Sequence, residues 1–248
     1  MATIDLAHGA LLFVVIGIAY FVRGMTGFGS GLIAVPWLAH VLPMKTVVPI
    51  IMSLDFAASL YLGGVGGKKS DWSEIRILLP FAVIGALVGA FALLRLPAEP
   101  VLMTLGVFAA IFGARNLLGM QPTGAISRLW AVPPALIGSG AGALFGIGAP
   151  PYIIYLTHRL TDKEAVRATY SWLFVADAGF RLLLFALTGL LFAKEVLLGI
   201  AVGVLPLMMG LSLGHRAHVR ASRDTVMRVI GATLILSGAS LVLKVMLQ

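Results

Sequence analysis

Long apolar stretches alternate with short polar ones along the whole chain, and this pattern predicts helices that lie in a membrane. Several charge-free stretches approach or exceed the roughly 18 residues that a membrane-spanning helix needs. Ten apolar segments are expected, at Ile4–Val22, Phe28–Leu42, Val47–Leu62, Ile77–Leu94, Val101–Ala114, Leu129–Ile147, Ala149–Thr157, Ala168–Ala193, Val196–Leu213 and Val229–Leu243. The second and the seventh are short and begin in sequence rich in glycine or proline. Each of these two, together with the segment before it, is predicted to form a hairpin that returns to its starting side. The other six are predicted to cross.

Composition supports this interpretation. The 248 residues are 60% hydrophobic and only 11% charged, with a mean hydropathy of +1.03, whereas soluble domains carry about a quarter charged residues. We therefore expect one all-α polytopic membrane domain over residues 1–248. The chain has no cysteine, which excludes disulfides, thiolate metal sites and cysteine nucleophiles. No basic residue precedes the first apolar segment, and this predicts an uncleaved first helix with its N-terminus outside.

The basic residues test the hairpin topology. It places twelve of them on one side: Lys68, Lys69, Arg76, Arg115, Arg128, Arg159, Lys163, Arg167, Arg216, Arg220, Arg223 and Arg228. The opposite side receives four: Lys45, Arg95, Lys194 and Lys244. Because cytoplasmic loops collect Lys and Arg, the larger group is predicted to face the cytoplasm and both termini to lie outside. The net charge of +8 is thereby explained without a nucleic-acid partner.

The same topology divides the chain into two repeats, residues 4–118 and 129–247, each a broken hairpin followed by three crossings. An odd number of crossings gives the halves opposite orientation. Three features recur in both halves: the tips Gly27-Phe28-Gly29 and Gly146-Ile147-Gly148, the acids Asp55 and Asp177, and the glycine pairs Gly85/Gly89 and Gly199/Gly203. Inverted repeats with helices interrupted at matching positions are typical of secondary transporters.

The interruptions themselves indicate an anion site. The stretch GMTGFGSGLIAVP at residues 24–36 places irregular backbone at membrane depth, which is tolerated only where it is buried in protein or lines a wet cavity. A helix that restarts there directs free N–H groups and its positive dipole end at the cavity. The candidate binding residues are Thr26, Gly27, Phe28, Gly29, Ser30, Gly31, Gly146, Ile147 and Gly148. The alternative is that glycines only allow close helix packing, which we favour for Gly85, Gly89, Gly138 and Gly142.

Two stretches carry a resemblance to a known family. GMTGFGSGLIAVP, with GALFGIGAPPYIIYL in the second half, resembles the TauE/SafE sulfite exporter family, also called the toluene sulfonate uptake permeases. The resemblance spans nearly the whole chain and departs from the usual pattern at Ala149-Pro150-Pro151, where further glycines are often found. It implies transport of sulfite, sulfonate or sulfoacetate-like anions across a bacterial inner membrane. The residues by themselves indicate only an anion.

Four charged residues fall within apolar segments. Asp177 and Arg181 share a helix face because they are four residues apart; they form either a structural pair or a site in which Arg181 binds the anion while Asp177 holds the guanidinium. Asp55 either carries a coupling proton or pairs with a basic residue such as Arg23 or Arg181. Arg23 either lines the pore or is a cytoplasm-facing anchor. Two aromatic residues, Tyr152 and Trp172, are further candidates for the cavity wall.

The expected function is secondary transport of a small organosulfur anion by alternating access, coupled to a proton or to sodium, by a monomer or a homodimer in the lipid bilayer. The alternatives are a passive anion channel of the same architecture and a transporter of a different small anion. An intramembrane enzyme would need Asp55 and Asp177 as a carboxylate pair, and no nucleophile or metal constellation accompanies them. We therefore expect no catalytic residue, no cofactor and no metal.

Overall fold

The computed structural model describes residues 6–66, 69–119, 124, 126–217 and 223–246, which form helices and connecting turns without a strand. The first residues of the segment expected from Ile4, and the basic residues Lys68 and Arg220, lie outside the described residues. The helices of the described part are α1 (Leu6–Thr26), α2 (Ser30–Leu38), α3 (Met44–Gly66), α4 (Trp72–Arg95), α5 (Ala98–Leu117), α6 (Val132–Phe145), α7 (Ala149–Arg159), α8 (Lys163–Leu187), α9 (Lys194–Ala217) and α10 (Arg223–Met246), with 3-10 turns η2 (Arg128–Ala131) and η3 (Leu190–Phe192).

Two helix starts are fixed by carboxylates. The side chain of Asp71 accepts hydrogen bonds from the backbone amides of Ser73 and Glu74 at the start of α4, and Asp162 accepts one from Glu164 at the start of α8. Such caps satisfy amides that a helix leaves free at its N-terminus. The hydrogen bond from the Ser73 hydroxyl, followed by those from the two amides, holds the pKa of Asp71 below its ordinary value.

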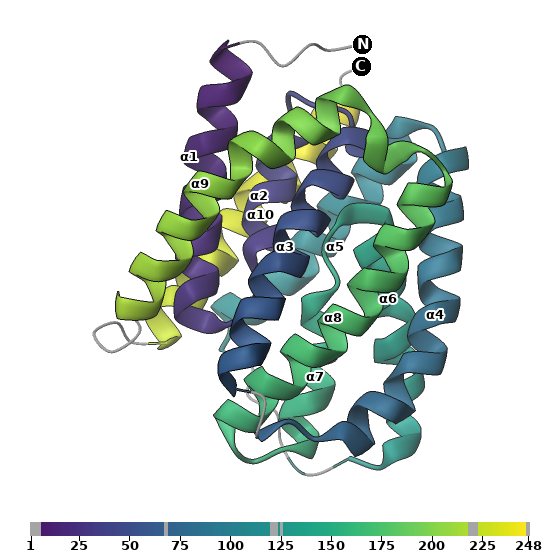
Figure 1. The fold of residues 1–248 in the computed structure, drawn as a ribbon, viewed down its shortest axis with the longest axis vertical. Helices are drawn as coiled ribbons and strands as arrows, with labels where there is room; N and C mark the ends of the chain where they lie inside the picture. The colour runs from purple at the N-terminus through teal and green to yellow at the C-terminus, as the bar shows by residue number, and fades with distance from the viewer. Residues whose placement is uncertain (1–5, 67–68, 120–123, 125, 218–222, 247–248) are drawn as a thin grey trace.

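The two short segments predicted from the sequence are α2 and α7, of 9 and 11 residues. In Figure 1, α1 descends from the upper end and α2 turns back upward, whereas α6 rises from the lower end and α7 turns back downward. Each pair is thus a hairpin, and the two hairpins return to opposite ends. The start of α1 and the end of α10 lie at the same end of the bundle (Figure 1).

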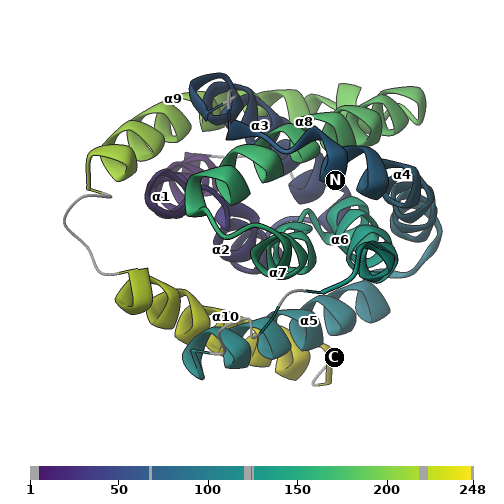
Figure 2. The same ribbon diagram turned by 90° about the horizontal axis from the view of Figure 1, so that it is seen from below.

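The helices pack in a regular set of partners. The hairpin helix α1 packs along α9, and its counterpart α6 packs along α4. At the centre α3 packs against α8, and these two also contact α9 and α4 respectively. The remaining pair, α5 and α10, forms an outer layer that covers α2, as the view along the bundle shows (Figure 2).

Glycines allow the closest of these contacts. A Cβ atom on Gly85 would collide with the carbonyl oxygen of Leu136, and one on Gly89 with that of Gly140, so α4 and α6 meet backbone to backbone. The packing role predicted for Gly85 and Gly89 is confirmed.

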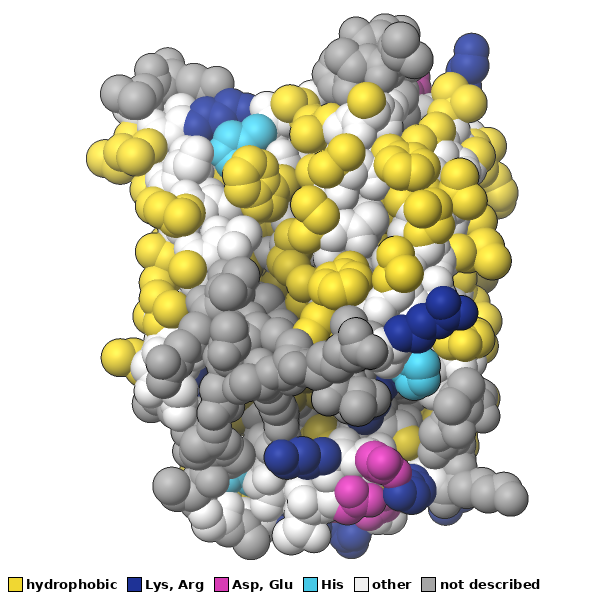
Figure 3. All heavy atoms as spheres, turned by 90° about the vertical axis from the view of Figure 1, so that its left-hand side faces the viewer, with side chains coloured by type: hydrophobic (Ala, Val, Ile, Leu, Met, Phe, Trp, Pro, Cys, Tyr) yellow, Lys and Arg dark blue, Asp and Glu magenta, His cyan; other side chains and the backbone are white. Residues whose placement is uncertain are grey.

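Within the described residues, six helices are long and apolar enough to cross a membrane. The apolar spans are Gly9–Thr26, Met44–Leu62, Trp72–Arg95, Ala98–Leu117, Lys163–Leu187 and Lys194–Arg216. This set includes α1, which we predicted as half of a hairpin, because α1 continues to Thr26 before the chain turns. It leaves out α10, which we predicted as a crossing, because the described apolar part of that helix is only Gly231–Met246. On the face shown in Figure 3, hydrophobic side chains cover much of the upper and middle part, and acidic and basic side chains lie together near the lower end.

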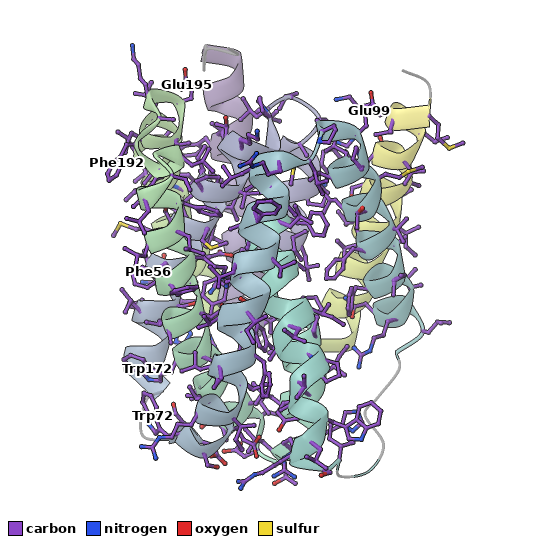
Figure 4. All side chains as sticks on the ribbon, turned by 90° about the vertical axis from the view of Figure 1, so that its right-hand side faces the viewer. Phe56, Trp72, Glu99, Trp172, Phe192 and Glu195 are labelled. Carbon is purple, nitrogen blue, oxygen red and sulfur yellow. The ribbon has the colours of Figure 1, made fainter. Side chains whose placement is uncertain are left out.

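The two ends of the bundle differ in charge. Figure 4 shows Glu99 and Glu195 at one end and Trp72 and Trp172 at the other. The starts of α4 and α8 and the ends of α5, α7 and α9 lie at the Trp72 end (Figure 1), and the described residues of the larger predicted basic group are found there. The described residues of the smaller group lie at the Glu99 end, where the ammonium groups of Lys45 and Lys244 donate to backbone carbonyls of Leu94 and His40.

We expect Gly89→Ala to destabilise the fold. Its methyl group would force the α4 and α6 backbones apart, and overpacking of this kind costs about 1–3 kcal/mol. The midpoint temperature of thermal unfolding, measured on the detergent-solubilised protein, should therefore fall by roughly 5 °C. The matched control is Gly179→Ala, whose methyl group would meet the Phe56 ring at an ordinary 3.5 Å and should leave the midpoint unchanged or slightly raised. Equal midpoints for the two variants would show that the α4–α6 contact is not close-packed.

Candidate functional site

Both hairpins turn through glycines in the left-handed backbone region. Gly27 and Gly29 have φ of 88° and 98° at the first tip, and Gly146 has φ of 74° at the second. A side chain would be strained in these conformations, whereas glycine adopts them freely. The chain therefore reverses within three residues between α1 and α2, and between α6 and α7.

The two tips lie against each other. A Cβ atom placed on Gly31, in the first turn of α2, would clash with the carbonyl oxygen of Gly146. The helices α2 and α7 therefore start next to each other and run in opposite directions (Figure 1). Neither start is capped by a side chain. In α7, Pro150 and Pro151 occupy the first turn and carry no N–H, so α2 supplies more of the free donors.

A small buried cavity lies where the tips meet. Its volume of about 10 Å³ leaves room for about one water molecule. The wall combines backbone of both tips with one basic, one acidic and two aromatic side chains. Its residues are Arg23, Gly29, Gly31, Leu32, Asp55, Gly146, Ile147, Gly148, Ala149, Tyr170 and Phe174.

Arg23 is the centre of one hydrogen-bonded cluster, and it is only 1% exposed. Its Nη1 lies 2.7 Å from Oδ1 of Asp55 and donates to the hydroxyl of Ser30 at 2.8 Å. Its Nη2 donates to the hydroxyl of Ser59 at 2.5 Å. The hydroxyls of Tyr20 and Ser30 both donate to Asp55 Oδ1. Because Arg23 is buried against a carboxylate and lines the cavity, the anchor interpretation is wrong.

Arg181 is the centre of a second cluster and is also fully buried. Its Nη2 lies 2.7 Å from Oδ2 of Asp177, one turn earlier on α8. That carboxylate accepts a hydrogen bond from the hydroxyl of Ser139 on one oxygen and from Tyr152 on the other, at 3.2 Å. The guanidinium occupies the space that a Cβ atom on Gly142 would fill. This glycine, predicted to serve helix packing, makes room for the buried charge.

One aromatic ring contacts both guanidinium groups. The Cζ atoms of Arg23 and Arg181 lie 5.4 Å and 5.3 Å from the centre of the Phe174 ring, which is cation–π distance. Each arginine also retains one buried N–H without a partner in the described structure, at Nε of Arg23 and Nη1 of Arg181. Buried donors are normally satisfied, so each of these two nitrogens could still take an acceptor; of the two arginines, Arg23 lines the cavity, whereas Nη1 of Arg181 packs against Gly142.

The far ends of the two half-helices are attached to different layers. At the end of α7, Arg159 donates to Oε1 of buried Glu74 on α4 at 2.9 Å, and Tyr155 donates to Oε2 at 2.6 Å. The hydrogen bond between Arg159 and Glu74 raises the pKa of Arg159 above its ordinary value. Beyond the end of α2, His40 shares a hydrogen bond with Ser240 of α10 at 3.0 Å. Thus α7 is fixed to α4, and α2 to the outer layer.

The remaining predicted residues have local contacts. The hydroxyl of Thr26 donates to the carbonyls of Val22 and Phe28 and so stabilises the tip backbone. Trp172 packs against Trp72 at 5.9 Å between ring centres, near the lower edge of the bundle (Figure 4), and is absent from the cavity wall of the described residues.

Sequence reasoning missed several members of the clusters. Tyr20, Ser59 and Ser139 lie in apolar helices where nothing nearby in the sequence marks them as polar partners. Phe174 and Tyr170 could have been found, because they precede Asp177 and Arg181 at helical spacing on the same face of α8.

These features define a class: a multi-pass helical membrane protein with two half-helices that meet at a buried, charged cavity. The chain belongs to the family described as Sulfite exporter TauE/SafE, whose sequence model matches residues 12–241. The resemblance read from the sequence is thereby confirmed, and the protein is a membrane transporter.

Two curated relatives agree with this class. The chain is 26% identical over 194 residues to the "Probable inner membrane transporter protein TsaS" of Comamonas testosteroni, covering 77% of this chain and 81% of the relative. It is 25% identical over 174 residues to a "Probable membrane transporter protein" of Haemophilus influenzae, covering 63% of this chain and 66% of the relative. Comparison with solved structures gives no match.

The buried ion pair on α8 generates a stability prediction. Asp177→Ala removes one partner and leaves the Arg181 charge buried, which destabilises a protein by about 3–5 kcal/mol. Replacing both, with Asp177→Leu and Arg181→Met, removes the charge and its partner together and should restore much of that loss. Thermal unfolding in detergent of the single and double variants measures the difference. A double variant no more stable than Asp177→Ala would contradict the pairing.

Proposed function

We propose that the protein is a secondary transporter that moves a small organosulfur anion, such as sulfite or a sulfonate, by alternating access. The main observation behind the proposal is that residues of both glycine tips and Arg23 line one cavity. The family description supplies the sulfur chemistry. The geometry supplies the reason for an anion.

The electrostatics of the cavity favour negative charge. Two uncapped helix N-termini begin at its wall, and helix N-termini stabilise anions through their amides and dipoles. Each buried arginine is neutralised by its own aspartate, and each keeps one N–H without a hydrogen-bond partner among the described residues; Arg23 is the one that lines the cavity. An oxyanion offers several acceptor oxygens, whereas a cation would face these donors without compensation.

The size of the cavity supports alternating access over a permanently open channel. Sulfite has four heavy atoms, whereas the cavity of about 10 Å³ has room for about one water molecule. To hold the anion, the tips at Gly31 and Gly146 must therefore separate. Since α2 and α7 are fixed at their far ends to different layers, movement of one layer relative to the other would part them.

The packing of helices supports the inverted repeats. If α1 to α5 correspond to α6 to α10, the contact of α1 with α9 corresponds to that of α6 with α4. The contact of α3 with α9 then corresponds to that of α8 with α4, and the pairs α3–α8 and α5–α10 each map onto themselves. A twofold axis in the membrane plane would produce this pattern. It is the relation on which rocking mechanisms of transporters depend.

Orientation can be tested because the chain has no cysteine. The positive-inside rule places the Trp72 end in the cytoplasm. We expect a membrane-impermeant maleimide applied to intact cells to label Leu96→Cys, at the end of α4, and to leave Leu118→Cys, after α5, unlabelled until the cells are opened. Both native side chains are exposed. The reverse labelling would contradict the assigned orientation and place both termini in the cytoplasm.

Transport should depend on the cavity. Purified protein in liposomes is expected to accumulate radiolabelled sulfite or a sulfonate, with saturation and against a concentration gradient when coupled. Arg181→Ala, Gly29→Val and Gly148→Val should each reduce the rate at least about tenfold, because they remove a buried donor or obstruct a tip. The control is Arg95→Ala, which removes an exposed guanidinium at the far end of α4.

Each variant is first compared with the wild type by size-exclusion chromatography, so that only folded protein is scored. Normal flux in all three variants, at the two tips and at the neighbouring Arg181 cluster, would contradict the site. Flux that rises without saturation and cannot be driven uphill would favour an anion channel of the same architecture.

A further inference from the structure

One face of α8 continues beyond the site that contains Arg181. Residues three and four apart share a helix face, and the series spaced in this way is Arg167, Tyr170, Phe174, Asp177 and Arg181. The last four belong to the cavity wall or to the Arg181 cluster. At 1.5 Å per residue, Arg167 lies about 21 Å from Arg181 along the helix, toward the end at which α8 begins. Arg167 therefore places a third guanidinium on the same stripe.

The side chain of Arg167 lies across the first glycine tip. A Cβ atom on Gly27 would lie 2.7 Å from its Nε, and Gly27 itself has φ of 88°. Its Nη2 donates to the carbonyl oxygen of Gly24 at 3.4 Å, longer than the usual 2.7–3.2 Å range. The guanidinium is thus held against the tip by van der Waals contact with Gly27 and by one weak hydrogen bond to Gly24.

Among the side chains that the structure describes, no carboxylate forms an ion pair with Arg167. Glu164, one turn earlier on α8, is paired with Lys69. The lack of an ion pair within the described residues distinguishes Arg167 from Arg23 and Arg181, each of which has its own aspartate. A half-buried, unpaired guanidinium is a ready partner for two oxygens of an oxyanion.

Two chain segments place Arg167 one step outside the cavity. Along the tip, Gly27 contacts Arg167 and Gly29 lines the cavity. Along α8, Tyr170 and Phe174 follow Arg167, and both line the cavity. Between the two positions the rings of Phe28 and Tyr170 meet edge to face, with centres 6.3 Å apart. Tyr170, one of these two rings, belongs to the cavity wall, so the ring pair stands on the way from Arg167 to the cavity.

We propose that Arg167 forms an outer binding site for the transported oxyanion at the Trp72 end, from which the anion passes the Phe28–Tyr170 pair into the cavity. This inference rests on the proposed function. An unpaired positive charge near the mouth of a path raises the local concentration of an anion and its rate of association. The outer site would therefore govern capture at low concentration, while the cavity governs translocation.

The experiment measures initial uptake of radiolabelled sulfite into inverted membrane vesicles, which present the cytoplasmic end to the medium. For Arg167→Gln we expect the KM to rise about tenfold with Vmax kept within about twofold, because capture loses its charge and translocation does not. Arg167→Lys, which keeps the charge, should bring the KM back to within about threefold of the wild type. Arg76→Gln is the control, since it removes an exposed basic charge from the start of α4 at the same end.

The dependence of uptake on ionic strength distinguishes electrostatic attraction of the anion by Arg167 from a purely structural role of this residue. Salt screens the field of an exposed or half-exposed charge, so raising the salt should slow wild-type uptake at low sulfite more than uptake by Arg167→Gln. If Arg167 only held the tip in place, its substitution would lower Vmax and thermal stability together. The salt dependence of uptake would stay unchanged, and Arg167→Lys and Arg167→Gln would have the same effect.

Each outcome decides something. If Arg167→Gln matches Arg76→Gln, or if both Arg167 variants fail to fold, the outer site is contradicted while the proposed transport is not. If wild-type vesicles take up no more sulfite than vesicles without the protein, both the sulfite transport and the outer site are contradicted. A raised KM rescued by lysine supports the outer site.

Discussion

A fully buried guanidinium at membrane depth is costly unless a carboxylate or backbone carbonyls accompany it, and the centre of this structure is arranged around two guanidinium–carboxylate pairs. Each aspartate also accepts hydrogen bonds from one serine and one tyrosine. The positions of these hydroxyl groups are exchanged between the hairpins: Tyr20 lies on α1 and Ser30 on α2, whereas Ser139 lies on α6 and Tyr152 on α7. In both halves an aspartate is thus paired with an arginine and accepts from one serine and one tyrosine, but these residues stand at different positions. Aligning the two halves position by position would not reveal this similarity.

The same constraint explains the glycines. A buried charge needs room as well as a partner, and Gly142 provides room for Arg181 by lacking a side chain. At the tips, Gly29 and Gly146 adopt backbone conformations that leave the first turns of α2 and α7 facing the cavity. Irregular backbone is tolerated at this depth where it is buried in protein or lines a cavity, and most residues of the two tips are buried. The breaks and the charges therefore support one another at a single place.

Segment lengths and glycine patterns were sufficient to predict the short helices α2 and α7, because a bilayer sets the length of a crossing helix and a short apolar segment has to turn back. The pairing of Asp177 with Arg181 followed from their spacing on one helix. The pairing of Asp55 with Arg23 did not, because the two residues lie on different helices and only tertiary packing selects Arg23 over Arg181. The contact of Arg159 with Glu74 joins α7 to α4 and was equally invisible to a local pattern.

Phe174 gives the two charged clusters a physical link. Its ring contacts both guanidinium groups and forms part of the cavity wall. If the tips part as proposed, α1, which carries Arg23, would shift relative to α8, which carries Phe174 and Arg181, and the contact of the ring with Arg23 would change. Loss of a cation–π contact costs on the order of 0.5–2 kcal/mol when the groups are desolvated, and a bound oxyanion could offset that loss through the unpartnered nitrogens of either arginine. The open arrangement would then be favoured chiefly when the anion is present, which is the condition that distinguishes a carrier from a leak.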